Sequence, residues 1–299
     1  MMKLIPLLLI ACQSRMINWY SQPYIKSLEC DGKSLFAELP KKYEPSDIAY
    51  DTVKQLLYVV SDNGHLAKMT VKGELIETYK VKGKPDLEAI ALLQAKPGIL
   101  YLGVEYPTQI IEYDIEAAET IRTITLDELV DENSRIPADH QGLESMTFLE
   151  NRNGKTYLLV GRQMDARVFV YETSKSDVLD LKYLGQFQAP GSGRDLSSLT
   201  LWKDRLWFVY DKSKLITYMD IKILDTSIQT INTTSLVDYT SLFTPINTLS
   251  MRIRGIEGLT FTKDHVFVAI DPPRIAPKDL LVYDHSTFFS CFASPSFVL

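Results

Sequence analysis

The chain contains, at residues 86–92, the stretch Asp86-Leu87-Glu88-Ala89-Ile90-Ala91-Leu92, which is one of five copies of a short motif. Each copy begins with an acid or a glycine, carries Ser or Glu at its third position and continues as an apolar strand. The other copies begin at Glu44, Gly142, Asp195 and Gly255, and consecutive third positions are 42, 56, 53 and 60 residues apart. Repeats of roughly 40–50 residues built from short strands predict an all-β fold, a β-propeller with one motif per blade.

Each motif is followed by three further segments of strand composition, which would complete a four-stranded blade. In the first repeat these are residues 56–61, 65–71 and 75–81, separated by turns that contain Asn63-Gly64 and Lys72-Gly73. The second segments are continuously apolar, as expected for strands buried between neighbouring blades. The fourth strands of the last two blades are predicted at residues 227–233 and 288–292.

The number of motifs predicts five blades. A sixth, degenerate blade within residues 233–254 is the alternative, but that stretch lacks a motif and reads as an elaborated loop. Residues 26–39 precede the first motif and have strand character. Such a segment is expected to complete the final blade, so that no strand edge is left unpaired.

Composition limits the classes of function. With 299 residues, of which 45% are hydrophobic, the chain can bury a full core as one domain, predicted at residues 26–299. The net charge of −6 provides no basic field for nucleic acid, and phosphate-binding loops and spaced Cys/His zinc motifs are absent from the sequence. We expect a monomer whose partner is a protein or a small ligand.

The N-terminus has the pattern of a bacterial lipoprotein signal. Residues 1–11 combine a short basic start with an apolar run that ends in Ala11, directly before Cys12. We expect cleavage before Cys12, lipid on its thiol, and a tether over residues 12–25. This predicts a location in the cell envelope, with the outer membrane or cell surface favoured. The alternative is an ordinary secretory signal with a coincidental cysteine.

Two further cysteines fall in segments that would share the final sheet. Cys30 lies in the N-terminal strand region and Cys291 in the predicted last strand. An exported location would permit a disulfide between them. Two separately buried thiols are the other possibility.

The third motif positions form the first candidate site. The first strand of each propeller blade lines the central channel, so these five side chains should converge there: Ser46, Glu88, Glu144, Ser197 and Glu257. Three carboxylates in a narrow channel repel one another, which raised pKa values or a bound cation would relieve. Oxygen ligands without His or Cys favour Ca²⁺. Alternatively, each Glu is hydrogen-bonded at a strand start or faces solvent.

The ends of the second strands form the other candidate group. They are expected at the same rim of the channel and comprise Asp62, Glu105, Arg162, Asp211 and Asp271. Arg162 could neutralise an acid there or bind an anionic ligand through two hydrogen bonds. The alternative is a set of turn-forming acids and rim salt bridges.

These motifs, in this order, resemble the SdiA-regulated (YjiK-like) family. The resemblance rests on Asp86-Leu87-Glu88-Ala89-Ile90, Gly142-Leu143-Glu144, Asp195-Leu196-Ser197-Ser198 and Ile256-Glu257-Gly258, together with the opening Glu44-Pro45-Ser46. It implies a five-bladed propeller exported in bacteria, with a bound calcium and no established reaction. More distantly the chain resembles NHL-type and phytase-like propellers.

Two classes of function are therefore expected. The first is a lipid-anchored, calcium-binding module that binds or senses a ligand. The second is a calcium-dependent hydrolase, of the phosphoesterase or lactonase kind, that uses the channel face. Propellers host both, so the fold does not decide between them.

Overall fold

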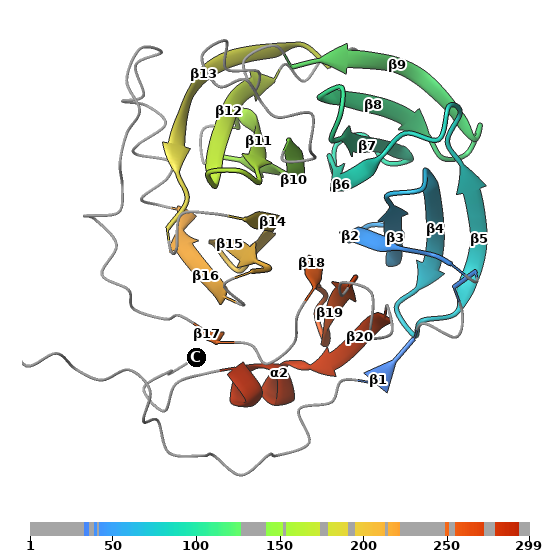
Figure 1. The fold of residues 1–299 in the computed structure, drawn as a ribbon, viewed down its shortest axis with the longest axis vertical. Helices are drawn as coiled ribbons and strands as arrows, with labels where there is room; N and C mark the ends of the chain where they lie inside the picture. The colour runs from blue at the N-terminus through green and yellow to red at the C-terminus, as the bar shows by residue number, and fades with distance from the viewer. Residues whose placement is uncertain are drawn as a thin grey trace, which may run out of the picture.

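The computed structural model describes residues 33–35, 39–40, 42–126, 142–151, 154–173, 179–190, 195–212, 215–221, 249–250, 255–271 and 279–292. Its strands form five four-stranded antiparallel sheets arranged around a central axis (Figure 1). The fold is a five-bladed β-propeller, as the five motifs predicted. Among the described helices, none has the length and apolar character needed to cross a membrane.

Each motif forms the innermost strand of a blade. The innermost strands are β2 (Pro45–Asp51), β6 (Leu87–Leu92), β10 (Leu143–Glu150), β14 (Leu196–Trp202) and β18 (Ile256–Phe261). The second strands are β3 (Leu56–Ser61), β7 (Ile99–Val104), β11 (Thr156–Arg162), β15 (Arg205–Tyr210) and β19 (His265–Ile270). The third strands are β4 (His65–Thr70), β8 (Gln109–Asp114), β12 (Arg167–Thr173), β16 (Leu215–Asp220) and β20 (Asp279–Asp284). The outer strands are β5 (Leu75–Lys80), β9 (Glu119–Thr125), β13 (Leu181–Gln188), β17 (Leu249–Ser250) and β1 (Lys33–Ser34).

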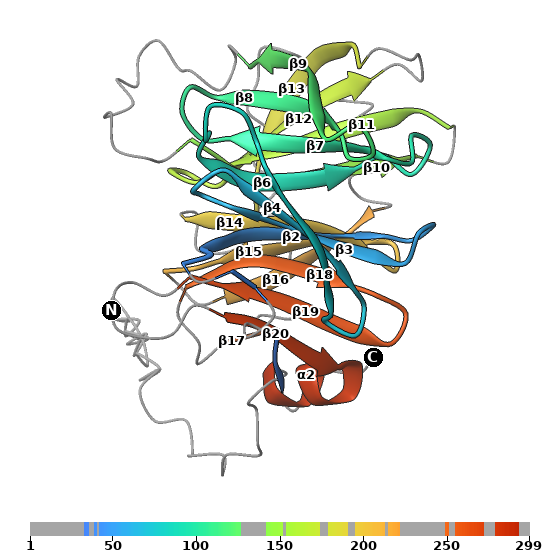
Figure 2. The ribbon, with the colours of Figure 1, turned by 90° about the vertical axis from the view of Figure 1, so that its right-hand side faces the viewer.

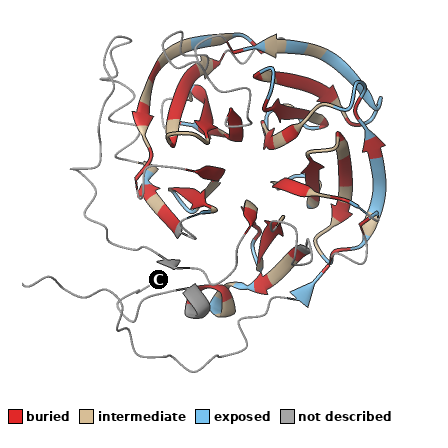
Figure 3. Ribbon diagram, in the orientation of Figure 1, coloured by how far each residue is buried: buried red, intermediate tan, exposed pale blue. Residues whose placement is uncertain are grey.

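The hydrophobic core is divided into five clusters, and each lies between two neighbouring blades. Burial follows this arrangement, because the second strands are buried along most of their length whereas β5 and β9 are largely exposed (Figure 3). The second strands are continuously apolar in sequence, and the sequence analysis predicted their burial between blades from that pattern. Packing between blades therefore fixes where each innermost strand sits around the axis.

The N-terminal segment closes the ring, as predicted. Strand β1 pairs with β20 through Lys33–Val282 and Ser34–Leu281, and the Leu35 amide donates to the Leu280 carbonyl oxygen at 2.8 Å. Leu35 is then buried in the cluster between the fifth and first blades. The final sheet thus combines strands from both ends of the described chain.

The prediction of a last strand at residues 288–292 was wrong. These residues belong to helix α2 (His285–Phe292), which lies beside β20 (Figure 2). Asp284 begins the helix, since its Oδ1 accepts the Thr287 amide at 2.7 Å. Phe288 and Phe289 are buried in the cluster between the fourth and fifth blades. Strand β1 already fills the outer position of the last blade, so the apolar segment packs as a helix instead.

The outer strand of the fourth blade also differs from the prediction. Residues 227–233 lie outside the described residues, and β17 fills the outer position by pairing with Leu215 and Ile216 of β16. The predicted signal, tether, Cys12 and Cys30 also fall outside the described residues, as does the side chain of Cys291.

Candidate functional site

The third motif position is a β-bulge in all five blades. The pairing between innermost and second strands skips one residue between the second and fourth positions, for example between Leu87 and Ala89. The same shift occurs in the other four blades. A bulge leaves its residue out of the regular pairing and re-aims its side chain. The skipped residues are Ser46, Glu88, Glu144, Ser197 and Glu257.

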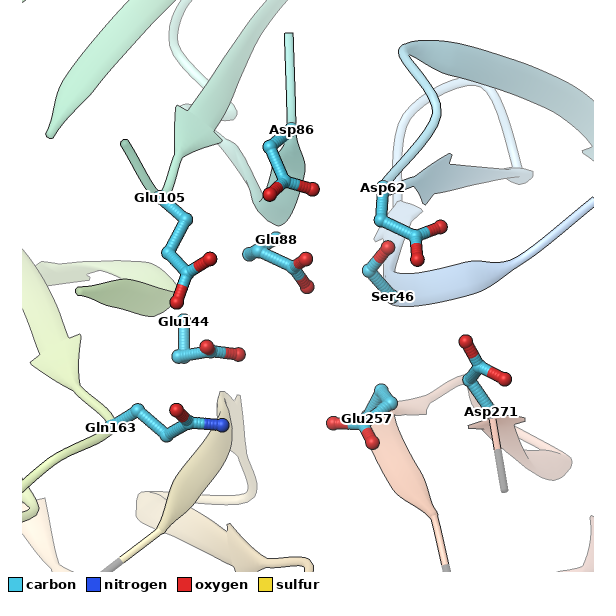
Figure 4. Close-up of a pocket in the computed structure, with 9 residues that line it drawn as sticks. All are labelled: Ser46, Asp62, Asp86, Glu88, Glu105, Glu144, Gln163, Glu257 and Asp271. Carbon is cyan, nitrogen blue, oxygen red and sulfur yellow. The ribbon is translucent and has the colours of Figure 1, made fainter. Parts of the chain in front are cut away.

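Four of these five side chains line one cavity at the centre of the ring. The cavity has a volume of about 370 Å³, and Ser46, Glu88, Glu144 and Glu257 face it (Figure 4). Ser197 is not among its lining residues. The Ser197 hydroxyl donates instead to the Ile256 carbonyl oxygen at 2.7 Å and so links the fourth blade to the fifth.

The residues that follow the second strands reach the same cavity from its rim. Asp62, Glu105 and Asp271 line it, together with two residues that the sequence analysis did not select, Asp86 and Gln163. Asp86 is the first residue of the second motif. The recurrent acid at that position was visible in the sequence and could have identified it.

The strand register corrects the predicted second group by one residue in the third blade. Leu143 pairs with Arg162, as Leu87 pairs with Val104, so the residue equivalent to Glu105 is Gln163. The backbone agrees, because the Gln163 amide donates to the Gly142 carbonyl oxygen just as the Glu105 amide donates to that of Asp86. The sequence analysis was one residue short here because β11 has seven residues and continues through Arg162, whereas the second strand of every other blade has six.

Arg162 therefore does not line the cavity. Its side chain is 2% exposed, and its Nε and Nη2 atoms donate to the two carboxylate oxygens of Asp165 at 3.0 and 2.6 Å. Its guanidinium carbon lies 5.2 Å from the centre of the Phe169 ring. This arginine is engaged within its own blade and is not oriented to bind an anion in the channel.

Asp211 is likewise not among the lining residues and joins neighbouring blades. Its Oδ1 accepts the Gly255 amide at 2.6 Å, and Glu105 accepts the Gly142 amide in the same way at 3.3 Å. A Cβ on Gly142 would lie 2.6 Å from the Glu105 carbonyl oxygen, so this approach requires a glycine. These bonds between blades are neither the turn contacts nor the rim salt bridges that the sequence analysis gave as the alternative.

The cavity is strongly acidic. Seven of its nine lining residues are carboxylic acids, and none of the nine is Lys or Arg. Burial raises the pKa of Glu144 well above its usual range, and the charges of Glu88, Glu105 and Glu257, with a hydrogen bond to Glu105, raise it further. The pKa of Glu88 is raised by burial and then by acids led by Asp86, and that of Glu257 by burial and then by acids led by Asp211. Losing protons from this cluster is therefore costly without a cation.

The carboxylates fall into two compact groups. Asp86, Glu88 and Glu105 present oxygen atoms that all lie within 4.8 Å of one another, and so do Glu44, Asp62 and Asp271. The first group comes from the second blade alone, whereas the second spans the junction between the first and fifth blades. Glu144 and Glu257, predicted to share one ion with Glu88, are outside both groups.

The family model named SdiA-regulated matches residues 34–274. The chain belongs to the SdiA-regulated family. No curated protein matches it. Two solved structures that it resembles are those of U3-55K and of the WD40 repeats of RRP9. Each is 9% identical with a TM-score of 0.45, over 86% of this chain and 99% or 98% of the other. At that TM-score neither structure carries an argument about this protein.

In this SdiA-regulated protein, the matched region contains all five motifs and all nine residues of the cavity. The cavity combines bulge residues from the innermost strands with residues at the ends of the second strands. Among the described residues, every blade except the fourth contributes to it, because Ser197 and Asp211 are both used in contacts with the fifth blade.

Proposed function

We propose that this protein is a calcium-binding module that binds or senses a ligand at the acidic cavity in its central channel. Its propeller fold and its membership of the SdiA-regulated family support a binding or sensing module. The observation that carries the calcium proposal is the cavity, in which seven carboxylic acids converge and none of the described lining residues is Lys or Arg. A divalent cation would relieve their repulsion.

The group formed by Asp86, Glu88 and Glu105 is the preferred position for the ion. Ca²⁺ binds oxygen ligands at about 2.3–2.6 Å, so two oxygens on opposite sides of one ion are about 5 Å apart. The 4.8 Å limit within this group fits that span. Glu144 is hydrogen-bonded to Glu105 but lies outside this group. Of the predicted ring, Glu88 is thus the central ligand of the proposal.

The hydrolase alternative receives less support. Phosphoester substrates need cationic side chains beside the metal, and Arg162 was the sequence candidate. Arg162 is instead paired with Asp165. Lys212, which is a cation near the rim among the described residues, binds Asp195 at 2.7 Å. The binding module is therefore the function that we adopt.

Calcium titration tests this proposal. We expect one Ca²⁺ per chain by isothermal titration calorimetry, and at a hundredfold excess over the dissociation constant a gain of about 2.7 kcal/mol in the free energy of unfolding. Glu88→Gln should weaken calcium binding at least tenfold. Its calcium-free form should be as stable as the wild type or more so, because the substitution removes one of the repelling charges.

Glu119→Gln provides the matched control, since Glu119 is exposed on outer strand β9. It should leave calcium binding unchanged. A melting temperature that does not respond to chelator in the wild type would exclude a calcium site. A loss of stability in Glu88→Gln that is equal with and without calcium would assign Glu88 a purely structural role.

We further propose that the mature protein is anchored by lipid on Cys12 in the cell envelope, on the basis of the residue 1–12 pattern alone. Cys12→Ser should release the protein from the membrane fraction or block processing, as measured by fractionation and mass spectrometry of the N-terminus. Unchanged membrane association of the variant would contradict the anchor.

A further inference from the structure

A cluster of exposed lysines lies on the first blade, at the same end of the strands as the cavity. The lysine cluster comprises Lys42, Lys80, Lys82 and Lys84. None of them has an ion pair among the described residues, whereas Lys54, Lys155 and Lys212 are each paired with an acid. Protein surfaces usually intersperse charges of both signs, because like charges repel. Unpaired positive charge is therefore concentrated at one place in a chain whose net charge is −6.

Backbone contacts fix the turn that carries this cluster. The connection from β5 to β6 begins with Val81, whose amide donates to the Gly64 carbonyl oxygen at 2.9 Å, and the Lys84 amide donates to the Val81 carbonyl oxygen at 3.2 Å. A Cβ on Gly64 would lie 2.7 Å from the Cα of Lys84, so the connection packs directly on the turn between β3 and β4. A Cβ on Gly83 would meet no atom within 4 Å. The turn is therefore held in place on its inner side and is open on its outer side.

His65 lies among these lysines in a fixed orientation. Lys80 is its direct partner in the pairing of β4 with β5. The Asn63 side-chain amide donates to the Lys42 carbonyl oxygen at 3.0 Å, so Asn63 Oδ1 accepts the His65 Nδ1 proton at 2.5 Å. His65 Nε2 has no hydrogen-bond partner among the described residues. Burial, and then the charges of Lys80 and Lys84, lower the pKa of His65, so both ammonium groups act on its ring.

The lysine cluster is separate from the acidic cavity. None of the four lysines lines the cavity, whereas Asp62 and Asp86, from the two turns that carry the cluster, do (Figure 4). Glu77 of β5 accepts the Tyr79 hydroxyl at 2.5 Å. The same face of the propeller therefore presents an acidic centre and a basic margin on the first blade.

We propose that the lysine cluster, with His65, is a binding site for a compact organic polyanion that carries several sulfate or phosphate groups. Each ammonium group supplies three hydrogen-bond donors to such oxyanions. A single exposed ion pair contributes little, so useful affinity requires a ligand that engages several lysines at once. The acidic cavity on the same face would repel an extended anionic surface such as a membrane, which favours a compact ligand. This inference is independent of calcium.

The experiment measures binding of sucrose octasulfate by calorimetry at physiological ionic strength, in chelator and in saturating calcium. Uncharged sucrose is the ligand control and should not bind. The double variant Lys82→Gln, Lys84→Gln should weaken octasulfate binding at least tenfold under both conditions. The matched control is Lys72→Gln, Lys263→Gln, which removes the same charge from exposed turns at the opposite end of the strands and should change binding less than twofold. All four lysines are exposed, so both variants should keep the melting temperature of the wild type.

Histidine NMR locates the ligand. Octasulfate should shift the His65 ring signals and raise the pKa of His65, because a bound anion favours the protonated ring. His265 and His285, at the opposite end of the strands, should not respond.

The outcomes separate this inference from the calcium proposal. Equal weakening by the two double variants, or no response of His65, overturns the lysine site. Binding that occurs only with calcium also overturns it, because the anion is then held by the ion. Competition by inorganic sulfate at equal molarity overturns the requirement for several anionic groups. None of these results changes the calcium titration, which tests the proposed function by itself.

Discussion

Asp47 shows how one residue can hold the centre of the ring together. It is 2% exposed, and its Oδ2 accepts the Ile90 amide at 3.0 Å while its Oδ1 accepts the Ser198 hydroxyl at 3.3 Å. Asp47 and Ser198 belong to the first and fourth blades, which are not neighbours, so this bond crosses the axis. A Cβ on Gly258 would lie 2.8 Å from the Cα of Asp47, so the fifth blade approaches the same point. The residues that follow the bulges of the first, fourth and fifth blades therefore meet near the axis.

Replacing Asp47 should distinguish a hydrogen-bonded link from simple packing. Asp47→Ala leaves the buried Ile90 amide without its acceptor, at a cost of about 1–3 kcal/mol for each unsatisfied group. Asp47→Asn should cost less, because its amide oxygen can still accept from Ile90 and its amide nitrogen can donate to Ser198. Burial raises the pKa of Asp47 well above its usual range, so the neutral amide resembles the protonated acid. Urea unfolding of both variants measures the difference, and equal losses would contradict the link.

At the scale of elements, the N-terminal strand is the closure of the propeller. Strand β1 has only two residues, so its backbone pairing is brief, and the side chains that follow it carry much of the attachment. Leu35 packs closely on Gly73 of the first blade, where an added Cβ would lie 2.4 Å from its side chain. Tyr43 donates from its hydroxyl to the Val59 carbonyl oxygen at 2.5 Å. The segment thus joins the first and last blades through packing as well as pairing.

Leu35→Ala should therefore destabilise the whole ring. Leu35 is 5% exposed, and truncating a buried leucine costs about 2–5 kcal/mol. The control is Ile76→Ala on outer strand β5, where the side chain is 49% exposed and the loss should be within about 0.5 kcal/mol. Denaturant unfolding gives both values. A Leu35 variant as stable as the Ile76 variant would show that closure does not depend on this contact.

At the scale of the whole molecule, the propeller brings acidic side chains from several blades into one cavity. The raised pKa values of Glu88, Glu144 and Glu257 all have burial as their largest cause and neighbouring acids as the next. Each residue alone would be a solvated glutamate. The ring brings them together, so the carboxylates of the calcium-free protein repel one another in the cavity where the proposed ion and ligand would bind.

The calcium-free protein should lose stability as pH rises from about 4.5 towards 7. Above the ordinary glutamate pKa of 4.5, the folded chain holds protons that the unfolded chain has released, so the free energy of unfolding falls with pH. The lowered pKa values of His65 and His285, caused mainly by burial, act in the opposite direction near pH 6. The difference in pH dependence between the wild type and Glu144→Gln excludes the histidine contribution, because both proteins contain His65 and His285.

Chemical unfolding at several pH values, in chelator, measures this dependence. The variant should show a shallower fall than the wild type, and saturating calcium should reduce the fall in the wild type because the ion favours the ionised cluster. A wild type and a Glu144→Gln variant with the same pH dependence would contradict the coupling of Glu144 to the other acids.

The sequence by itself determined the innermost strands, the preference for five blades over six, and the convergence of four of the five third motif positions. These features follow from local sequence, because the same short motif forms the same innermost strand in every blade. The blades are related by rotation about one axis, so equivalent residues come together at the centre. The same reasoning placed Glu88, Glu144 and Glu257 in one cavity with Asp62, Glu105 and Asp271. It also anticipated that residues before the first motif would complete the last blade.

Only the tertiary structure decided which residues at each position remain available to the cavity. Ser197 and Asp211 have the expected positions but bond the fifth blade. Strand β11 is one residue longer than the other second strands, which places Gln163 rather than Arg162 at the rim. Residues 288–292 are apolar enough for a strand, yet they form a helix because β1 already occupies the sheet edge. Hydrogen bonds between blades and competition for a sheet edge depend on neighbours that are distant in sequence, so no local pattern could specify them.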